Sequence, residues 1–164
     1  LAMFSMVYNC ITELSMTEKQ LDALERQFSI QFPEDYRKLV LSPPSYLSVL
    51  LKQNAKTGGG KSLVPLFLNY KTVRHKNWLR RNPDDEDYFP FDPNDDSTPW
   101  PDRYFIIGSD SGGNCFCIAP KTKTSRVYFL EAGDLSFEDY AADMNEFVKR
   151  LFQLYGQFAL IELE

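Results

Sequence analysis

Residues 16–42, MTEKQLDALERQFSIQFPEDYRKLVLS, contain the signals of two consecutive helices. Thr17 is followed three residues later by Gln20, which is the spacing of a capping box. Three apolar residues then fall on one helical face, at Leu21, Leu24 and Phe28. The stretch therefore predicts a first helix from about Thr17 to Phe28.

A second, short helix is predicted directly after the first. Pro33 suits a first-turn position, and Glu34 and Asp35 follow it where the helix dipole favours negative charge. The pattern stops at Pro43-Pro44, because proline cannot continue a helix. The N-terminal part of the chain is therefore expected to be helical.

Three compact apolar runs further along the chain predict strands: YFIIG (104–108), NCFCIA (114–119) and RVYFL (126–130). The segment SDSGGN joins the first two runs in the manner of a hairpin. Because each run is apolar on both of its alternating faces, we expect these strands to form the covered centre of an antiparallel sheet.

Two more helices and one short strand complete the predicted elements. Asp143 and Glu146 form a second capping pattern at the start of a long closing helix. Its apolar stripe consists of Met144, Phe147, Val148, Leu151, Phe152 and Tyr155. LNYKTVRHKNWLRRN (68–82) predicts a further helix, and LVPLF (63–67) predicts a strand that Pro65 confines to an edge or a strand start.

The composition bounds the class of protein. With 164 residues, 43% of them hydrophobic and 25% charged, the chain is long enough to fold as a single domain, 1–164. Its three cysteines are odd in number and fit a reduced, cytoplasmic setting. The sequence shows neither an apolar run of membrane-spanning length nor the basic start of a signal peptide.

The net charge of −5 is unevenly distributed along the chain. Between Lys71 and Arg81 there are five Lys or Arg residues and no acid, whereas Asp84 to Asp96 holds seven acids and no base. The Pro-rich surroundings of those acids have no periodicity, so we expect an exposed acidic loop at about residues 82–103. A nucleic-acid patch around Trp78 is the less favoured interpretation of the basic stretch, because the adjacent acids repel phosphate.

The stretch AKTGGGKS (55–62) raises the alternative of a nucleotide-binding loop. Gly60-Lys61-Ser62 matches the end of a P-loop, but the first glycine position is Ala55. Pro65 also follows where a phosphate-capping helix should be in its first turns. We therefore interpret Gly58 to Ser62 as a glycine-rich connection and keep a nucleotide-binding enzyme as a third candidate function.

No other motif supplies residues for catalysis, a cofactor or a metal. Cys115 and Cys117 share one strand face, and we interpret them as small buried hydrophobes. Asp92 to Asp96 imitates the opening of a calcium loop but lacks its glycine and its bidentate glutamate. His75 lies between two basic residues, with no acid to orient it as a base. We expect no catalytic residue, no cofactor and no metal, and a protein that is not an enzyme.

The acidic loop is the candidate protein-binding surface. Acids steer a basic protein partner toward a surface, and exposed aromatic side chains anchor it there. A merely solvated loop is the alternative that the sequence leaves open. The candidate partner-binding residues are Asp84, Asp85, Glu86, Asp87, Tyr88, Asp95, Asp96 and Trp100.

Three stretches together resemble the SUKH superfamily. Residues 16–42 are similar to its opening helix and to the Leu-Pro-x-Asp-Tyr turn into its second helix, with Phe32 in place of the usual Leu. FIIGSDSGGNCFCIA (105–119) resembles its strand, glycine-containing turn and strand. RVYFLEAGDLSFEDYAADMNEFVKRLF (126–152) resembles its last strands and closing helix.

The resemblance implies an α+β fold, in which N-terminal and C-terminal helices pack on a mainly antiparallel sheet of five or six strands. It also implies a cytoplasmic, non-catalytic immunity protein of bacterial polymorphic or contact-dependent toxin systems, which neutralises a toxin domain, often a nuclease. A eukaryotic branch implies the alternative of a regulatory scaffold for cell-wall assembly. Our hypothesis is an immunity protein that binds its cognate toxin through the acidic loop, with no direct nucleic-acid or membrane binding.

Overall fold

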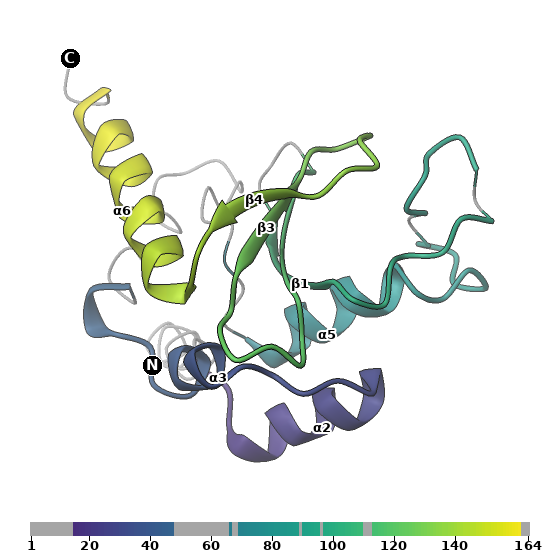
Figure 1. The fold of residues 1–164 in the computed structure, drawn as a ribbon, viewed down its shortest axis with the longest axis horizontal. Helices are drawn as coiled ribbons and strands as arrows, with labels where there is room; N and C mark the ends of the chain where they lie inside the picture. The colour runs from purple at the N-terminus through teal and green to yellow at the C-terminus, as the bar shows by residue number, and fades with distance from the viewer. Residues whose placement is uncertain are drawn as a thin grey trace, which may run out of the picture.

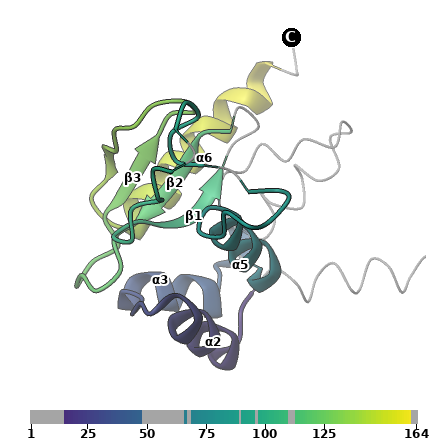
Figure 2. The ribbon, with the colours of Figure 1, turned by 90° about the vertical axis from the view of Figure 1, so that its right-hand side faces the viewer.

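A computed structural model of the chain describes residues 15–47, 66, 69–88, 90–95, 97–109 and 113–161, with side chains up to residue 154. The described elements are α2 (Glu18–Phe28), α3 (Glu34–Leu41), α5 (Tyr70–Leu79), β1 (Phe105–Ser109), β2 (Cys115–Ile118), β3 (Val127–Leu130), β4 (Glu138–Ala141) and α6 (Met144–Ile161). Figures 1 and 2 show the sheet beside α6, with α2 and α3 at one end of it and α5 along β1. The chain is therefore an α+β protein.

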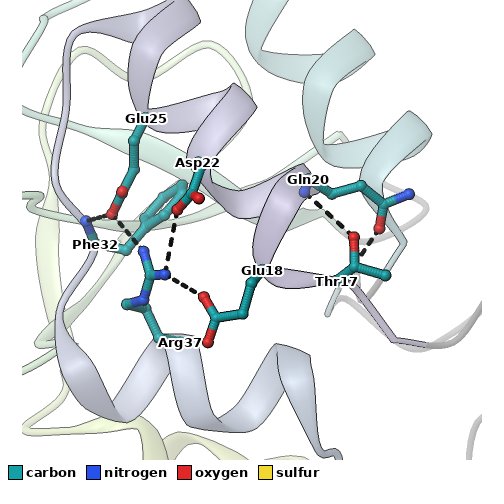
Figure 3. Close-up of polar contacts among 7 residues, drawn as sticks. All are labelled: Thr17, Glu18, Gln20, Asp22, Glu25, Phe32 and Arg37. Atoms are coloured by element: carbon teal, nitrogen blue, oxygen red, sulfur yellow. Dashed lines mark hydrogen bonds and ion pairs between the residues drawn. The ribbon is translucent and has the colours of Figure 1, made fainter.

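Helix α2 begins at the predicted capping box. The Thr17 backbone N–H donates to Gln20 Oε1 at 2.9 Å, and the Gln20 backbone N–H donates to Thr17 Oγ1 at 3.3 Å (Figure 3). The helix ends at Ser29, whose φ of 54° places it in the left-handed region that often terminates helices. Local hydrogen bonding thus defines both ends of the helix, and the predicted helix is confirmed.

An arginine of α3 joins the first two helices. The Arg37 guanidinium binds Glu18 and, at 2.9 Å, the Glu25 carboxylate, and it lies 3.5 Å from Asp22 (Figure 3). Glu25 Oε1 also accepts a hydrogen bond from the Phe32 backbone N–H at 2.8 Å. Two helices and the connection between them are therefore held by one planar cation.

We expect Arg37→Lys to lower the free energy of unfolding by about 1–2 kcal/mol, because an ammonium group cannot reproduce the forked contacts of a guanidinium. The matched control is Lys38→Ala, which removes the exposed pair between Lys38 and Glu34, an interaction of only about 0.3–0.5 kcal/mol. Urea denaturation followed by circular dichroism measures both. Equal losses in the two variants would contradict a structural role for the Arg37 cluster.

Asp35 joins α3 to the later part of the chain. Its carboxylate accepts hydrogen bonds from the Ser125 hydroxyl at 2.6 Å and from the Ser125 backbone N–H at 3.1 Å. The Met144 N–H at the start of α6 donates to the same carboxylate at 3.4 Å. The α6 start is also capped as predicted, because the Glu146 N–H donates to Asp143 Oδ1 at 2.8 Å. One side chain therefore fixes the meeting point of α3, β3 and α6.

The sheet is antiparallel, with the strand order β1-β2-β3-β4. All three predicted strand runs are confirmed, and β4 is a fourth strand that the sequence did not delimit. The predicted LVPLF strand is represented by an isolated bridge between Leu66 and Gly108, its other residues lying outside the described part. The five or six strands expected from the resemblance are not confirmed, since the described residues form four.

Both faces of the sheet are apolar, as the sequence predicted. One face joins the buried side chains of the helices in a first-face cluster, which includes Phe105, Ile107, Phe116, Ile118, Val127 and Phe147. The alternate strand residues point the other way and form a second-face cluster: Tyr104, Ile106, Cys115, Cys117 and Leu130, joined by Trp100, Phe91, Tyr128 and Phe137. The helices cover the first face, so a different segment must cover the second.

The outer edge of β1 is occupied by α5. The side chain of Asn77, fully buried on α5, accepts a hydrogen bond from the Ile106 N–H at 2.9 Å and donates to the Ile106 carbonyl at 2.8 Å. An amide side chain thus pairs with the strand as a neighbouring strand would. The register of β1 and β2 shifts between Ile106 and Gly108.

In the described part of the chain, no helix is both long and apolar enough to cross a membrane.

Candidate protein-binding surface

The acidic loop begins where α5 ends, and its first turn is held to that helix. The Trp78 indole N–H donates to Asp85 Oδ2 at 3.3 Å. Asp85 also closes its own turn, because its Oδ1 accepts from the Asp87 N–H at 3.0 Å and its carbonyl accepts from the Tyr88 N–H at 3.0 Å. Asp85 is therefore half-buried and engaged in local bonds, while Asp84, Glu86 and Asp87 are exposed.

Arg80 connects the middle of the loop to the sheet. Its guanidinium donates to the Pro90 carbonyl at 3.0 Å and lies 5.1 Å from the centre of the Trp100 ring. It also approaches Cys115 Sγ of β2 at 3.6 Å. A guanidinium over an indole is the favoured cation–π arrangement. The loop is therefore attached to the second face of the sheet through an arginine at the end of α5.

Trp100 is buried, with 3% of its surface exposed, so its predicted place among exposed anchoring aromatics is wrong. Its indole N–H donates to the Tyr104 carbonyl at 2.8 Å, which satisfies the one polar group of the ring. The physical reason is the apolar second face, whose residues Ile106 and Cys117 need a cover that the helices do not supply. Trp100 therefore positions the loop from beneath.

Two phenylalanines extend this cover. Phe91 of the loop lies edge-on to Trp100 at 5.7 Å and stacks on Phe137 at 5.8 Å between ring centroids. Phe137 in turn stacks on Tyr104 at 3.6 Å. Aromatic contacts of these geometries stabilise a fold beyond the area that they bury. Phe91 and Trp100 thus point inward, while the carboxylates of Asp84, Glu86, Asp87 and Asp95 remain at the surface.

The second half of the loop carries Asp95 at the surface. Hydrogen bonds from the Ser97 hydroxyl at 2.6 Å and the Thr98 hydroxyl at 2.8 Å hold the pKa of the Asp95 carboxyl below its usual value. Asp95 is therefore charged at neutral pH. Tyr88 is half-buried, and Asp96 lies outside the described residues. The predicted set is thus divided into exposed acids, a half-buried turn and a buried anchor.

Arg81 binds the chain where the acidic loop enters β1. Its guanidinium donates to the Tyr104 carbonyl at 2.7 Å and to Asn77 Oδ1 at 3.1 Å, and it lies 5.6 Å from the Phe28 ring centre. Burial lowers the pKa of Arg81 to about 10, against the opposing effect of Asp102. The group remains protonated at neutral pH. This buried charge is compensated by carbonyl oxygens and serves the fold.

The other candidate sites show no assembled chemistry in the described part of the chain. Cys115 and Cys117 are buried on the second face, and burial raises the pKa of the Cys117 thiol. His75 is exposed on α5. Among the described residues, no three His, Cys, Asp or Glu side chains gather as metal ligands would. The glycine run Gly58 to Ser62 lies outside the described residues, so the nucleotide-binding alternative is untested.

Comparison with models of known protein families identifies the family of this chain. The model of the SMI1 / KNR4 family (SUKH-1) matches residues 15–150, which include α2, the sheet and the acidic loop. The chain belongs to the SMI1 / KNR4 family (SUKH-1). The resemblance seen in the sequence is thereby confirmed. No curated protein and no solved structure matches this SUKH-1 chain.

Sequence reasoning missed the residues that hold the acidic loop in place. Arg80 lies in the predicted helix 68–82 and Phe137 in the stretch 126–152, and the sequence analysis gave neither side chain a contact with the loop. A signal was present, because strands that are apolar on both faces require two covers. The helices account for one cover, and the aromatic residues within the acidic loop are the apolar side chains available for the other.

Proposed function

We propose that this chain is a non-enzymatic, cytoplasmic immunity protein that binds and neutralises a cognate bacterial toxin domain through its acidic loop. The observation that carries the proposal is the division of the loop into two sides. Trp100 and Phe91 are packed into the second-face cluster, while Asp84, Glu86, Asp87 and Asp95 face solvent. A charged surface that is already ordered loses less entropy on binding than a mobile one.

Membership of SUKH-1 supports a binding role, because the resemblance described above implies immunity proteins without catalysis. The charge of the loop favours a basic partner. A nuclease domain fits this description, since a site that holds phosphate tends to be basic. Complementary charges of this kind raise the association rate by roughly 10- to 1,000-fold, and the gain falls with ionic strength.

The test is co-expression of this chain with the toxin domain encoded beside its gene, scored by cell survival and co-purification. We expect survival with the unchanged chain and loss of protection when Asp84→Asn, Glu86→Gln and Asp87→Asn are combined. Asp85 is left intact because it holds the turn and Trp78. In purified complexes, we expect the triple variant to associate at least about tenfold more slowly at low salt.

The matched control raises the net charge of −5 by the same three units at another surface. It combines Glu34→Lys on α3 with Asn145→Lys on α6, both at exposed residues. In Figure 1 these two helices lie away from the acidic loop. Equal slowing in both variants would assign the effect to total charge. Cell death despite folded, soluble protein would exclude immunity against that toxin and favour the regulatory scaffold.

A further inference from the structure

The hairpin between β3 and β4 carries an exposed apolar side chain that the fold does not use. Among the described residues, Leu135 is one of four large hydrophobic side chains that are exposed, with 49% of its surface accessible. Two of the others have contacts that account for them: Tyr46 packs edge-on against Phe152, and Trp78 bonds to Asp85. Leu135 instead directly follows the turn in the short connection between β3 and β4.

The hairpin tip is an ordered structure. Glu131 to Asp134 form a turn closed by the Asp134 N–H donating to the Glu131 carbonyl at 3.0 Å, with Gly133 at a φ of +86°. The Asp134 carboxylate then accepts from the Leu135 N–H at 2.6 Å. Asn114 Oδ1, from the turn before β2, accepts from the Ala132 N–H at 2.8 Å. Leu135 is therefore held in the solvent by a turn that is itself tied to the sheet.

The same hairpin is joined to the acidic loop. Phe137, two residues after Leu135, packs on Phe91 and Trp100, with centroid separations of 5.8 Å to each ring. Both segments lie on the side of the molecule away from α6 (Figures 1 and 2). The second-face cluster thus fixes the hairpin and the loop relative to each other from beneath.

The charge of the hairpin selects the kind of partner. Residues 131–139 contain four acids and no Lys or Arg. Glu131, Asp134 and Glu138 are exposed, whereas Asp139 pairs with Arg126 at 2.9 Å. An exposed apolar side chain with acidic neighbours along the chain can supply both the apolar contact and the polar rim of a protein interface. The acidic rim fits a basic protein and disfavours a polyanion or a second copy of this acidic hairpin.

We propose that the β3–β4 hairpin forms the second half of the partner-binding surface, with Leu135 inserted into an apolar recess of a basic protein domain. This inference rests on the proposed function and adds to it the residue that supplies apolar contact. The two halves act differently. The acidic loop accelerates association, and Leu135 slows dissociation, because burying an apolar anchor affects mainly the lifetime of a complex.

The experiment measures binding of the purified toxin domain from the co-expression test, carrying an inactivating substitution, to the full chain. Surface plasmon resonance at low and high salt gives both rate constants. We expect Leu135→Gln to weaken binding at least about tenfold through faster dissociation, with an unchanged salt dependence. The matched control is Leu154→Gln, an exposed leucine on α6, which should leave the affinity within about twofold. Circular dichroism checks that both variants are folded.

Each alternative result has a distinct meaning. An unchanged dissociation rate for Leu135→Gln, while the acidic-loop triple variant still associates slowly, would overturn this inference and leave the proposed function standing. Binding that is insensitive to both sets of substitutions would overturn the whole surface. Absence of binding by the unchanged chain would overturn the proposed function and this inference together.

Discussion

Replacing Trp100 with alanine is expected to lower the free energy of unfolding by about 3–5 kcal/mol, the range for removing a large aromatic side chain from a core. The ring is 3% exposed and contacts Phe91 and Phe137, and Arg80 lies over its face. Its truncation leaves a cavity, removes one of the two hydrogen bonds to the Tyr104 carbonyl and uncovers the apolar second face. Urea unfolding followed by circular dichroism measures the loss.

Trp78 provides a matched control, since the chain has two tryptophans. Trp78 is 38% exposed on α5, and its indole N–H donates to Asp85 at 3.3 Å. We expect Trp78→Ala to cost less than about 1 kcal/mol, as surface substitutions usually do. A Trp100→Phe variant keeps most of the ring and should recover most of the lost stability. Equal losses for Trp78→Ala and Trp100→Ala would contradict the buried-anchor interpretation.

The same substitution separates folding from binding. If Trp100 positions the acidic loop from beneath, its loss should raise the rate of proteolytic cleavage within residues 82–99 before the helices are affected. Toxin binding should weaken in parallel, because the carboxylates are then no longer ordered before the partner arrives. Unchanged cleavage with reduced global stability would mean that the loop is held by other contacts, such as the bond between Arg80 and Pro90.

The helices were predictable because their signals are local. The capping pair Thr17 and Gln20 lies within one turn, and both of its hydrogen bonds are present. The strand runs were predictable for a similar reason, since alternation within YFIIG or NCFCIA shows that both faces are apolar. Such patterns predict that a helix is capped or that a sheet face is buried. They do not predict which distant residues pack on that face.

The direction of the loop aromatics was not predictable from the loop itself. An aromatic residue among carboxylates is compatible with an exposed anchor or with an inward-facing one, and the sequence interpretation chose exposure for Trp100. The choice is decided by Phe137, which lies outside the acidic stretch and reaches Trp100 and Phe91 only in the folded chain. Long-range pairing of this kind leaves no periodic signal. The exposure of the acids, in contrast, follows from the cost of burying charge.

Asn77 is a polar residue whose burial could likewise not be predicted from the sequence. Replacing it is expected to have the second large effect on the free energy of unfolding. In the sequence, Asn77 stands between Lys76 and Trp78 in a basic helix and has no sign of burial. In the fold it is 0% exposed and bonded to both backbone groups of Ile106. We expect Asn77→Leu to lower the free energy of unfolding by about 2–4 kcal/mol. The Ile106 N–H and carbonyl lose their hydrogen-bond partner, and each buried polar group left without one costs about 1–3 kcal/mol.

Leucine matches asparagine closely in size, so this substitution tests hydrogen bonding more than volume. The control is Asn145→Leu on the exposed surface of α6, for which a change within about 0.5 kcal/mol is expected. Hydrogen exchange localises the effect: the Ile106 amide should lose protection, because its acceptor Asn77 Oδ1 is gone. If Ile106 stayed protected and stability were unchanged, the edge of β1 would not depend on Asn77. We also expect Asn77→Leu to loosen the acidic loop, since Arg81 binds both Asn77 and the Tyr104 carbonyl where the loop enters β1.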